Sequence, residues 1–248
     1  MYPDFSVGPL TFHTFGLMMA LGFVAASTVV YFELKRKGLN PECVYWIAIA
    51  AAAGGLLGSK IHYLLLHLDD LKSDPLSSAF SGAGLVWYGG FIGGLGAAMI
   101  VIRLYRLPWG KAFDAGAPGL ALGYAFGRMG CFLNGDDYGK PSDLPWAMEF
   151  RDGSPPTHFK VQPTQLYESF SSLLIFALLM FLRKKLKHDW ALTCLYVALA
   201  GIERFLVEFV RANRMGQSQQ QILALATAVI AAVAFVWIQA RPSKVPAS

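Results

Sequence analysis

The 248 residues of this chain are 55% hydrophobic and only 15% charged, with a mean hydropathy of +0.44. This composition is too apolar for an ordinary soluble domain and indicates an integral membrane protein. The net charge is +5, from 21 lysines and arginines against 16 acidic residues. The basic residues stand in short clusters beside apolar runs, which fits anionic lipid headgroups better than nucleic acid.

Seven apolar runs are each long enough for a bilayer-spanning helix, which needs about 20 residues. In chain order they cover 11–33, 44–66, 84–105, 112–132, 164–183, 190–210 and 219–240. The first run has no basic leader and is too long for a signal-peptide core, so we expect it in the mature protein. No stretch is left for a soluble domain of any size. We therefore predict an all-α polytopic fold, with 1–248 as a single transmembrane domain.

The basic residues in the loops predict the orientation of these helices. One set of alternate loops carries about twice as many lysines and arginines as the other, and the positive-inside rule places that richer set in the cytoplasm. The N-terminus is thus expected outside and the C-terminus inside. The richer set contains Lys35, Arg36, Lys37, Arg103, Arg106, Lys111, Arg183, Lys184, Lys185, Lys187, Arg241 and Lys244.

The longest loop, 133–163, faces outward in this topology and is rich in Pro, Gly and Asp. Structureless connections of this length are uncommon, and a long loop favours a functional lid or binding segment over a simple linker. The loop follows directly on Arg128, which the run 112–132 carries to the end of an apolar segment. An unpaired guanidinium at membrane depth costs several kcal/mol. We therefore expect Arg128 to meet a partner, a water-filled cavity or an anionic ligand.

Further charged residues fall inside or beside the predicted helices. Arg204 and Glu208 are one helical turn apart on the sixth run, and Arg211 continues the same stripe at the outer surface. Together with Arg128 they predict a cationic pocket in the outer half of the bilayer, where guanidiniums hold a phosphate by bidentate hydrogen bonds. For Lys60 and Asp114 two interpretations are equally favoured: a functional role, or a pairing between helices that only neutralises their charges.

Glycines cluster on the second and third runs, where small residues let two helix backbones approach. For most of them we predict a packing role. Tyr88-Gly89-Gly90 allows two interpretations, an interfacial aromatic anchor or a place where a lipid headgroup nears the backbone. The cysteines Cys43, Cys131 and Cys194 lack C-x-x-C spacing, so neither a zinc site nor a disulfide framework is expected.

The stretch from Gly127 to Gly139 resembles the signature G-R-x-G-[NC]-F-x-N-G-x-x-x-G of prolipoprotein diacylglyceryl transferases, which are bacterial membrane enzymes. Four further segments of this chain resemble motifs of that family and occur in the same order as in the family. They are the segments His13–Met18, Trp87–Gly90, Pro163–Glu168 and Arg204–Arg211.

This resemblance implies transfer of the diacylglyceryl group of phosphatidylglycerol to a lipobox cysteine of a prolipoprotein, in the bacterial inner membrane. The phosphate is then held by Arg128 and Arg204, because cations must take up the charge of the leaving group. No metal or organic cofactor is implied, since donor lipid and acceptor peptide bring their own reacting groups. The substrate-binding residues expected are Arg128, Asn134, Gly139, Asp136, Gln165, Tyr167, Glu168, Glu208, Arg211, Gly89 and Gly90.

Departures from the family pattern concern the base that takes the thiol proton. Tyr88 and Gln162 stand where many members have histidine, and Phe15 and Ala200 where tyrosine is common. A phenol is a weak base at neutral pH, since its ordinary pKa is about 10. Two alternatives stay open: the substrate thiol ionises in the cationic field, or Tyr88 acts as the base beside Arg128.

Three functions therefore compete for this sequence. The diacylglyceryl transferase is the first, with Arg128, Arg204 and Tyr88 as catalytic residues. The second is a diverged relative that binds or transports anionic lipid without catalysis, or uses another acceptor. The third is a proton or ion channel built on Glu203, Glu208 and Asp114.

Overall fold

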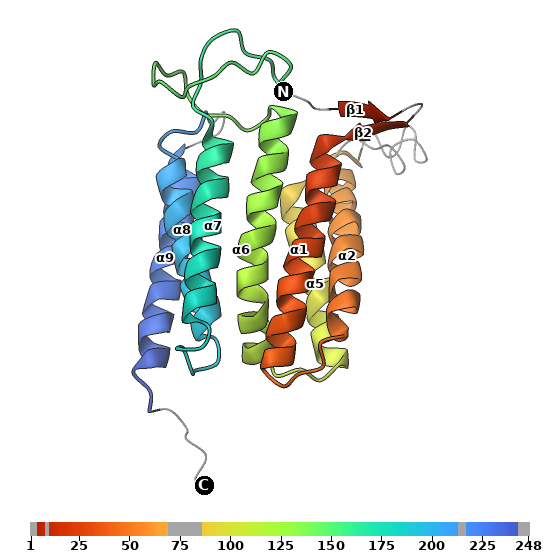
Figure 1. Cartoon of the computed structure of the whole chain (residues 1–248), viewed down its shortest axis with the longest axis vertical. Coiled ribbons are helices and arrows are strands. Elements are labelled where there is room, and N and C mark those ends of the chain that lie inside the picture. Colours follow the sequence, from red (N-terminus) through yellow and green to blue (C-terminus); the bar gives the residue numbers. More distant parts are fainter. Residues whose placement is uncertain (1–3, 8–9, 69–85, 213–216, 243–248) are drawn as a thin grey trace. The chain divides into compact units, whose positions relative to one another are not determined.

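The structure is a computed structural model and describes residues 4–7, 10–68, 86–212 and 217–242. Seven helices lie within these residues, and Figure 1 shows them. They are α1 (Thr14–Arg36), α2 (Cys43–Leu66), α5 (Trp87–Leu104), α6 (Trp109–Asn134), α7 (Thr164–Leu182), α8 (Ala191–Val207) and α9 (Gln217–Gln239). Each helix coincides with one predicted apolar run to within a few residues.

A short β-hairpin precedes the first helix of this otherwise all-helical structure. Strand β1 (Asp4–Val7) pairs antiparallel with β2 (Leu10–His13), and Asp4 lies opposite His13. The two strands are separated by two residues in the sequence, the commonest spacing for a hairpin. The predicted first helix begins at residue 11, whereas α1 begins at Thr14 because β2 includes the three residues before it.

Four of these helices are long and apolar enough to cross a membrane, namely α1, α2, α7 and Gln219–Gln239 of α9, while Tyr88–Leu104 is a shorter apolar helix. Their large apolar side chains are mostly exposed, as Leu56, Ile92, Phe181 and Ile230 illustrate. Exposed apolar surface of this extent is typical of helices that face lipid. The chain is thus a membrane protein with several apolar helices.

The chain divides into two compact units, 1–30 with 113–248, and 31–112. In the second unit, α2 and α5 pack through glycines. A Cβ on Gly54 would meet the Ala97 side chain at 2.6 Å, and a Cβ on Gly58 would meet the Gly89 carbonyl and the Gly93 Cα. Only glycine permits such close backbone approach, which confirms the predicted packing role.

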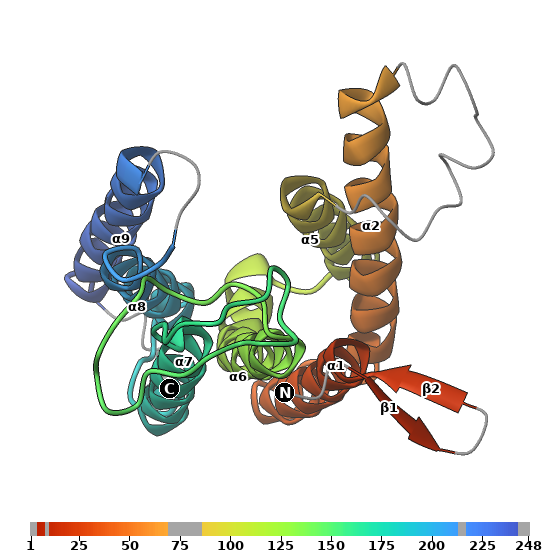
Figure 2. The same cartoon turned by 90° about the horizontal axis from the view of Figure 1, so that it is seen from above.

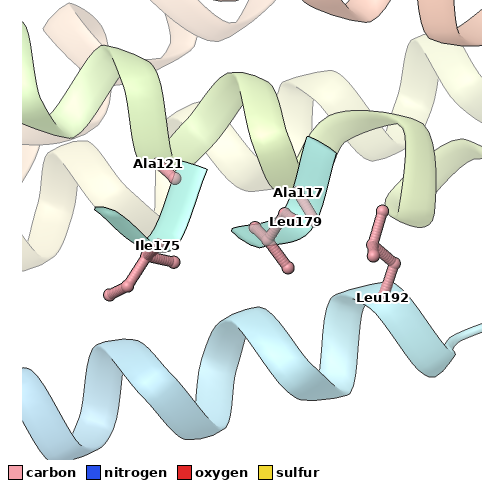
Figure 3. Close-up of a cluster of buried hydrophobic side chains, with 5 residues drawn as sticks. All are labelled: Ala117, Ala121, Ile175, Leu179 and Leu192. Atoms are coloured by element: carbon pink, nitrogen blue, oxygen red, sulfur yellow. The ribbon is translucent and has the colours of Figure 1, made fainter. Parts of the chain in front are cut away.

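In the first unit, small side chains let α6, α7 and α8 pack closely. Ala117 and Ala121 of α6 face Ile175 and Leu179 of α7, and Leu192 of α8 completes the buried cluster (Figure 3). Two α7 hydroxyls reinforce this contact: Ser169 donates to the Ala125 carbonyl (3.0 Å) and Ser172 to the Ala121 carbonyl (3.1 Å). The pairing of α6 with α7 thereby fixes the position of Arg128, which follows Ala125 on α6, relative to Glu168, which directly precedes Ser169 on α7.

The predicted long loop is present as the segment 135–163, and it lies over one end of α6 and α7 (Figures 1 and 2). Its outward placement stays a prediction. Short β-bridges organise it, joining Val161 to Pro141 and to Met148. The loop is also tied to the helices. Trp146 Nε1 donates to the Tyr167 hydroxyl of α7 (2.6 Å), and Lys140 N donates to the Val210 carbonyl beyond α8 (2.8 Å).

Candidate functional site

The charged residues predicted on separate helices meet around one carboxylate. Glu168 lies in the first turns of α7 and is 1% exposed. Arg128 of α6 forms an ion pair with Glu168 Oε2, and Arg204 of α8 lies 3.5 Å from Oε1. Arg211 approaches the same Oε1 at 3.8 Å. Three guanidiniums from three parts of the chain therefore converge on Glu168, as the hypothesis of a shared pocket requires.

A second carboxylate joins two of these guanidiniums. Asp137 Oδ2 accepts from Arg128 Nη1 at 2.9 Å, and Asp137 Oδ1 lies 2.6 Å from Arg211 Nη2. Asp137 adopts a left-handed φ of 60°, directly after the turn that ends α6. Aspartate tolerates this conformation better than most residues. The turn thus directs both carboxylate oxygens of Asp137 at guanidiniums.

Arg204 is held by partners on two helices. Its Nη2 lies 2.9 Å from Glu208 Oε2, one turn further along the chain, and 2.8 Å from Gln220 Oε1 of α9. Of the two arginines that the sequence places near Glu208, Arg204 and Arg211, it is Arg204 that forms the ion pair. The predicted continuous helical stripe is wrong at its end, because α8 ends at Val207 and Arg211 instead bridges to Gly139 of the loop.

The residues of the signature hold the loop against α6 and α7. Gln165 Nε2 donates to the Asp136 carbonyl at 2.5 Å, and Asn134 Nδ2 donates to Asp136 Oδ2 at 2.8 Å. Asp136 stands at a signature position where glutamate is common, and that resemblance suggests a contact from Asp136 to Arg128. In the structure Asp137 contacts Arg128, whereas the Asp136 side chain pairs with Asn134. A Cβ on Gly139 would meet the Val210 carbonyl at 2.6 Å, so glycine is needed where the loop crosses the chain after α8.

Three buried polar atoms around this turn have neither a hydrogen bond nor an ion pair with any described residue. They are Arg128 Nε, Gln165 Oε1 and Asp136 Oδ1. Unpaired buried polar atoms are uncommon in folded proteins. Their grouping beside the guanidiniums is the arrangement expected of a site for a polar ligand.

The three guanidiniums of the predicted cationic pocket face as many carboxylates. Arg128, Arg204 and Arg211 face the carboxylates Asp137, Glu168 and Glu208. Burial raises the pKa of Asp137, but Arg211 and Arg128 outweigh it and lower that pKa below the ordinary value. Asp137 is the most exposed of the three carboxylates, with a 44% exposed side chain. It is therefore the one that an incoming anion can replace at least cost.

A metal is poorly suited to the same place. Cys131, Asp136 and Asp137 bring one ligand atom each within 4.8 Å of one another. Both oxygens of Asp137 already contact guanidiniums, however, and those positive charges oppose a cation.

Tyr124 and Gln220 contact the cluster but were not predicted from the sequence. Tyr124 donates its hydroxyl hydrogen to Glu168 Oε1 at 2.9 Å, and its spacing of four residues before Arg128 on α6 is a signal that could have identified it. Gln220 offered no such signal, because its contact with Arg204 joins two helices.

Tyr88, Gly89 and Gly90 belong to the second unit, at the start of α5. Gly89 is buried against α2, where an added Cβ would meet Gly58 and His62, and Gly90 faces Ser59 in the same way. These contacts agree with a packing role. A role of Tyr88 beside Arg128, and a lipid contact at the two glycines, stay predictions.

The sequence of this chain is similar to those of known proteins. The family model described as prolipoprotein diacylglyceryl transferase matches residues 4–237. A relative from Clostridium tetani is 35% identical over 240 residues, which cover 93% of this chain and 95% of the relative. One from Pseudomonas aeruginosa is 35% identical over 220 residues, covering 83% of this chain and 78% of the relative. Both relatives are named phosphatidylglycerol–prolipoprotein diacylglyceryl transferase.

Proposed function

The chain belongs to the prolipoprotein diacylglyceryl transferase family, and from this membership we propose how its residues transfer a diacylglyceryl group from phosphatidylglycerol to a prolipoprotein. The protein is a membrane-bound transferase of lipoprotein biosynthesis. The alternative of a lipid-binding relative without catalysis is not favoured, because the similar proteins carry the name of the transferase.

The observation that supports the site is the clamp of Arg128 and Arg211 on a single carboxylate. Asp137 presents two oxygens to two guanidiniums, at 2.9 and 2.6 Å. A phosphate diester also presents two oxygens that share one negative charge, and guanidiniums bind such groups by paired hydrogen bonds. The headgroup phosphate of phosphatidylglycerol displaces Asp137 from this clamp. Its oxygens also accept a hydrogen bond from the buried Arg128 Nε.

Arg204 reaches the same phosphate from α8. Its side chain is 30% exposed, while Glu168 and Glu208 hold its two terminal nitrogens. In the reaction, the acceptor thiolate attacks the carbon of the diacylglyceryl group that is bonded to a phosphate oxygen. The carbon–sulfur bond forms as the carbon–oxygen bond breaks, and glycerol phosphate leaves with the electron pair. Arg128 and Arg204 stabilise the negative charge that grows on the leaving phosphate, which is worth several kcal/mol in a water-poor site.

The remaining predicted residues position this clamp. Glu168 fixes the guanidiniums, and Tyr167 anchors the loop through Trp146. Asn134, Asp136 and Gln165 shape the turn that carries Asp137. Gly139 lets the loop pass next to Arg211. The acceptor is the lipobox cysteine of the prolipoprotein.

All seven helices cross the bacterial inner membrane, with the N-terminus and the loop 135–163 outside. Two features support this orientation, the asymmetry of lysines and arginines between alternate loops and the position of the headgroup site under that loop. A cysteine-free variant with single cysteines at Ser142 or Lys185 tests it in intact cells. A membrane-impermeant maleimide should label position 142 alone, and labelling of position 185 instead would reverse the topology.

The activity itself is tested with purified protein, phosphatidylglycerol vesicles and a synthetic lipobox peptide. Mass spectrometry should find the peptide heavier by one diacylglyceryl group, and a peptide with serine in place of cysteine should stay unmodified. Arg128→Ala and Arg204→Ala should each insert into membranes and lose most of the transfer. Unchanged transfer by Arg128→Ala would overturn the proposed clamp.

A further inference from the structure

Glu203 of α8 is a carboxyl group at membrane depth that the proposed clamp does not use. It is half-buried and lines a groove of about 280 Å³ between α7 and α8. The rest of this groove is largely apolar, formed by residues such as Ile175, Leu199 and Leu206. An ionisable residue in such surroundings is costly and commonly functional.

The negative charge of Glu203 is less compensated by its neighbours than the charges of Glu168 and Glu208 are. Glu168 and Glu208 each contact a guanidinium, but no ion pair found among the described residues includes Glu203. The groups that face or influence it electrostatically come from three helices: Tyr124 and Arg128 of α6, Tyr167 and Glu168 of α7, and Tyr196 and Arg204 of α8. Glu203 thus lies beside the site but takes part in none of its ion pairs.

The Ser171 hydroxyl gives Glu203 a hydrogen-bond partner in either protonation state. Ser171 Oγ lies 2.9 Å from Glu203 Oε1 and 3.1 Å from the Glu168 carbonyl oxygen. When Glu203 is ionised, Ser171 donates to its carboxylate. When Glu203 carries a proton, the carboxylic acid donates to Ser171 Oγ, and the hydroxyl turns its own hydrogen to the Glu168 carbonyl. Glu203 can therefore gain and lose a proton without leaving a buried polar group unpaired.

We propose that Glu203, supported by Ser171, accepts the proton of the substrate thiol in the transfer reaction, an inference that rests on the proposed function. The sulfur–hydrogen bond breaks as the proton moves to the Glu203 carboxylate, and the resulting thiolate forms the bond to the glycerol carbon. The electron pair of the broken carbon–oxygen bond leaves with glycerol phosphate. That phosphate, or water, removes the proton from Glu203 afterwards and restores the carboxylate.

This assignment differs from both alternatives left open by the sequence. It requires neither Tyr88 as the base nor a thiol that ionises unaided. Glu203 is adjacent in sequence to Arg204 and is linked through Ser171 to the residue that joins the guanidiniums. A thiol placed in the groove beside Glu203 is therefore next to the clamp that holds the lipid phosphate.

The test compares Glu203→Gln with the unmodified protein in the vesicle assay, from pH 7 to pH 9.5. General base catalysis commonly contributes about 100-fold or more, so kcat should fall about 100-fold at pH 7. Free thiols ionise with a pKa of about 8.5, so at pH 9.5 the loss should shrink to less than about 10-fold. A loss that is the same at every pH indicates a structural role and would overturn the proposal.

Further variants separate the possible failures. Glu42→Gln makes the same chemical change on a carboxylate at the start of α2 and should keep the full rate. Ser171→Ala should lose about 10-fold at pH 7, with the deficit again shrinking at high pH, and it decides the question if Glu203→Gln does not fold. If the unmodified protein forms no product, the proposed function is wrong. If the unmodified protein and Glu203→Gln are both fully active, only the role of Glu203 is wrong.

Discussion

Arg128 of α6 and Glu168 of α7 form an ion pair in which the side chains are only 9% and 1% exposed. A pair this deep loses most of its hydration, and it persists because each charge meets the other at close range. Glu168 also receives the Tyr124 hydroxyl and lies near Arg204 and Arg211. The pair is therefore the centre from which the rest of the site is positioned, and the first prediction concerns it.

Glu168→Gln should destabilise the protein and abolish transfer. Glutamine has the same shape but no charge, which leaves Arg128 buried with Asp137 as its remaining carboxylate partner. Removing one member of a buried ion pair typically costs about 3–5 kcal/mol. The melting temperature in detergent and the transfer rate measure the two effects. A variant that melts like the parent would show that the pair contributes little to stability.

Asp137→Asn should bind phosphatidylglycerol more tightly than the parent does. Asparagine tolerates the left-handed φ of 60°, so the change removes the charge without straining the turn. Arg128 and Arg211 then lose the carboxylate that competes with the lipid phosphate. The rise in melting temperature on adding phosphatidylglycerol should be larger in the variant. A smaller rise would show that Asp137 assists binding instead of competing with it.

Acid should weaken the contact between the loop and α6 through the same residue. The pKa of Asp137 is lower in the folded protein than in the unfolded chain, so the folded state binds its proton less readily. Its contribution to stability is fully present above the ordinary aspartate pKa of about 3.9 and is lost as the pH falls through the lower folded value. Melting temperatures between pH 6 and pH 3 should fall more steeply in the parent than in Asp137→Asn.

Gly139→Ala should loosen the loop at its crossing with the chain after α8. An added Cβ would meet the Val210 carbonyl at 2.6 Å and the Thr164 methyl at 2.7 Å. Crowding of this kind commonly costs about 1–3 kcal/mol. Gly116→Ala is the matched control, because a Cβ there meets nothing within 4 Å. The control should be neutral or slightly stabilising in thermal melts, since alanine favours the helix. Equal melting temperatures for the two variants would contradict the prediction.

Asp114→Ala should lower stability while leaving the chemistry intact. Asp114 is 2% exposed, and its Oδ1 accepts hydrogen bonds from Thr193 N (2.8 Å) and Thr193 Oγ1 (2.7 Å) in the first turn of α8. Leaving such donors unpaired costs about 1–3 kcal/mol. Arg128 lies further along α6 by about 20 Å, given the helical rise of 1.5 Å per residue. The rate per folded molecule should therefore stay at the parent value below the melting transition.

The sequence by itself determined the helices of this protein and their polar exceptions. In a bilayer each spanning segment must satisfy its own backbone hydrogen bonds over about 20 apolar residues, so a local property of the chain identifies each helix. The same cost marks Arg128, Arg204 and Glu208 as residues in need of partners. The pairing of Arg204 with Glu208 was predictable too, because it depends only on helical spacing.

Only the tertiary structure decided which partners those residues have. Glu168 joins guanidiniums that lie 36 to 43 positions away along the chain, and Gln220 reaches Arg204 from another helix. Asp137, and not its neighbour Asp136, is the loop carboxylate that pairs with Arg128. These contacts depend on the packing of α6, α7 and α8 and on one left-handed turn. Electrostatic contacts act through space and have no sequence period, so no local pattern could have assigned them.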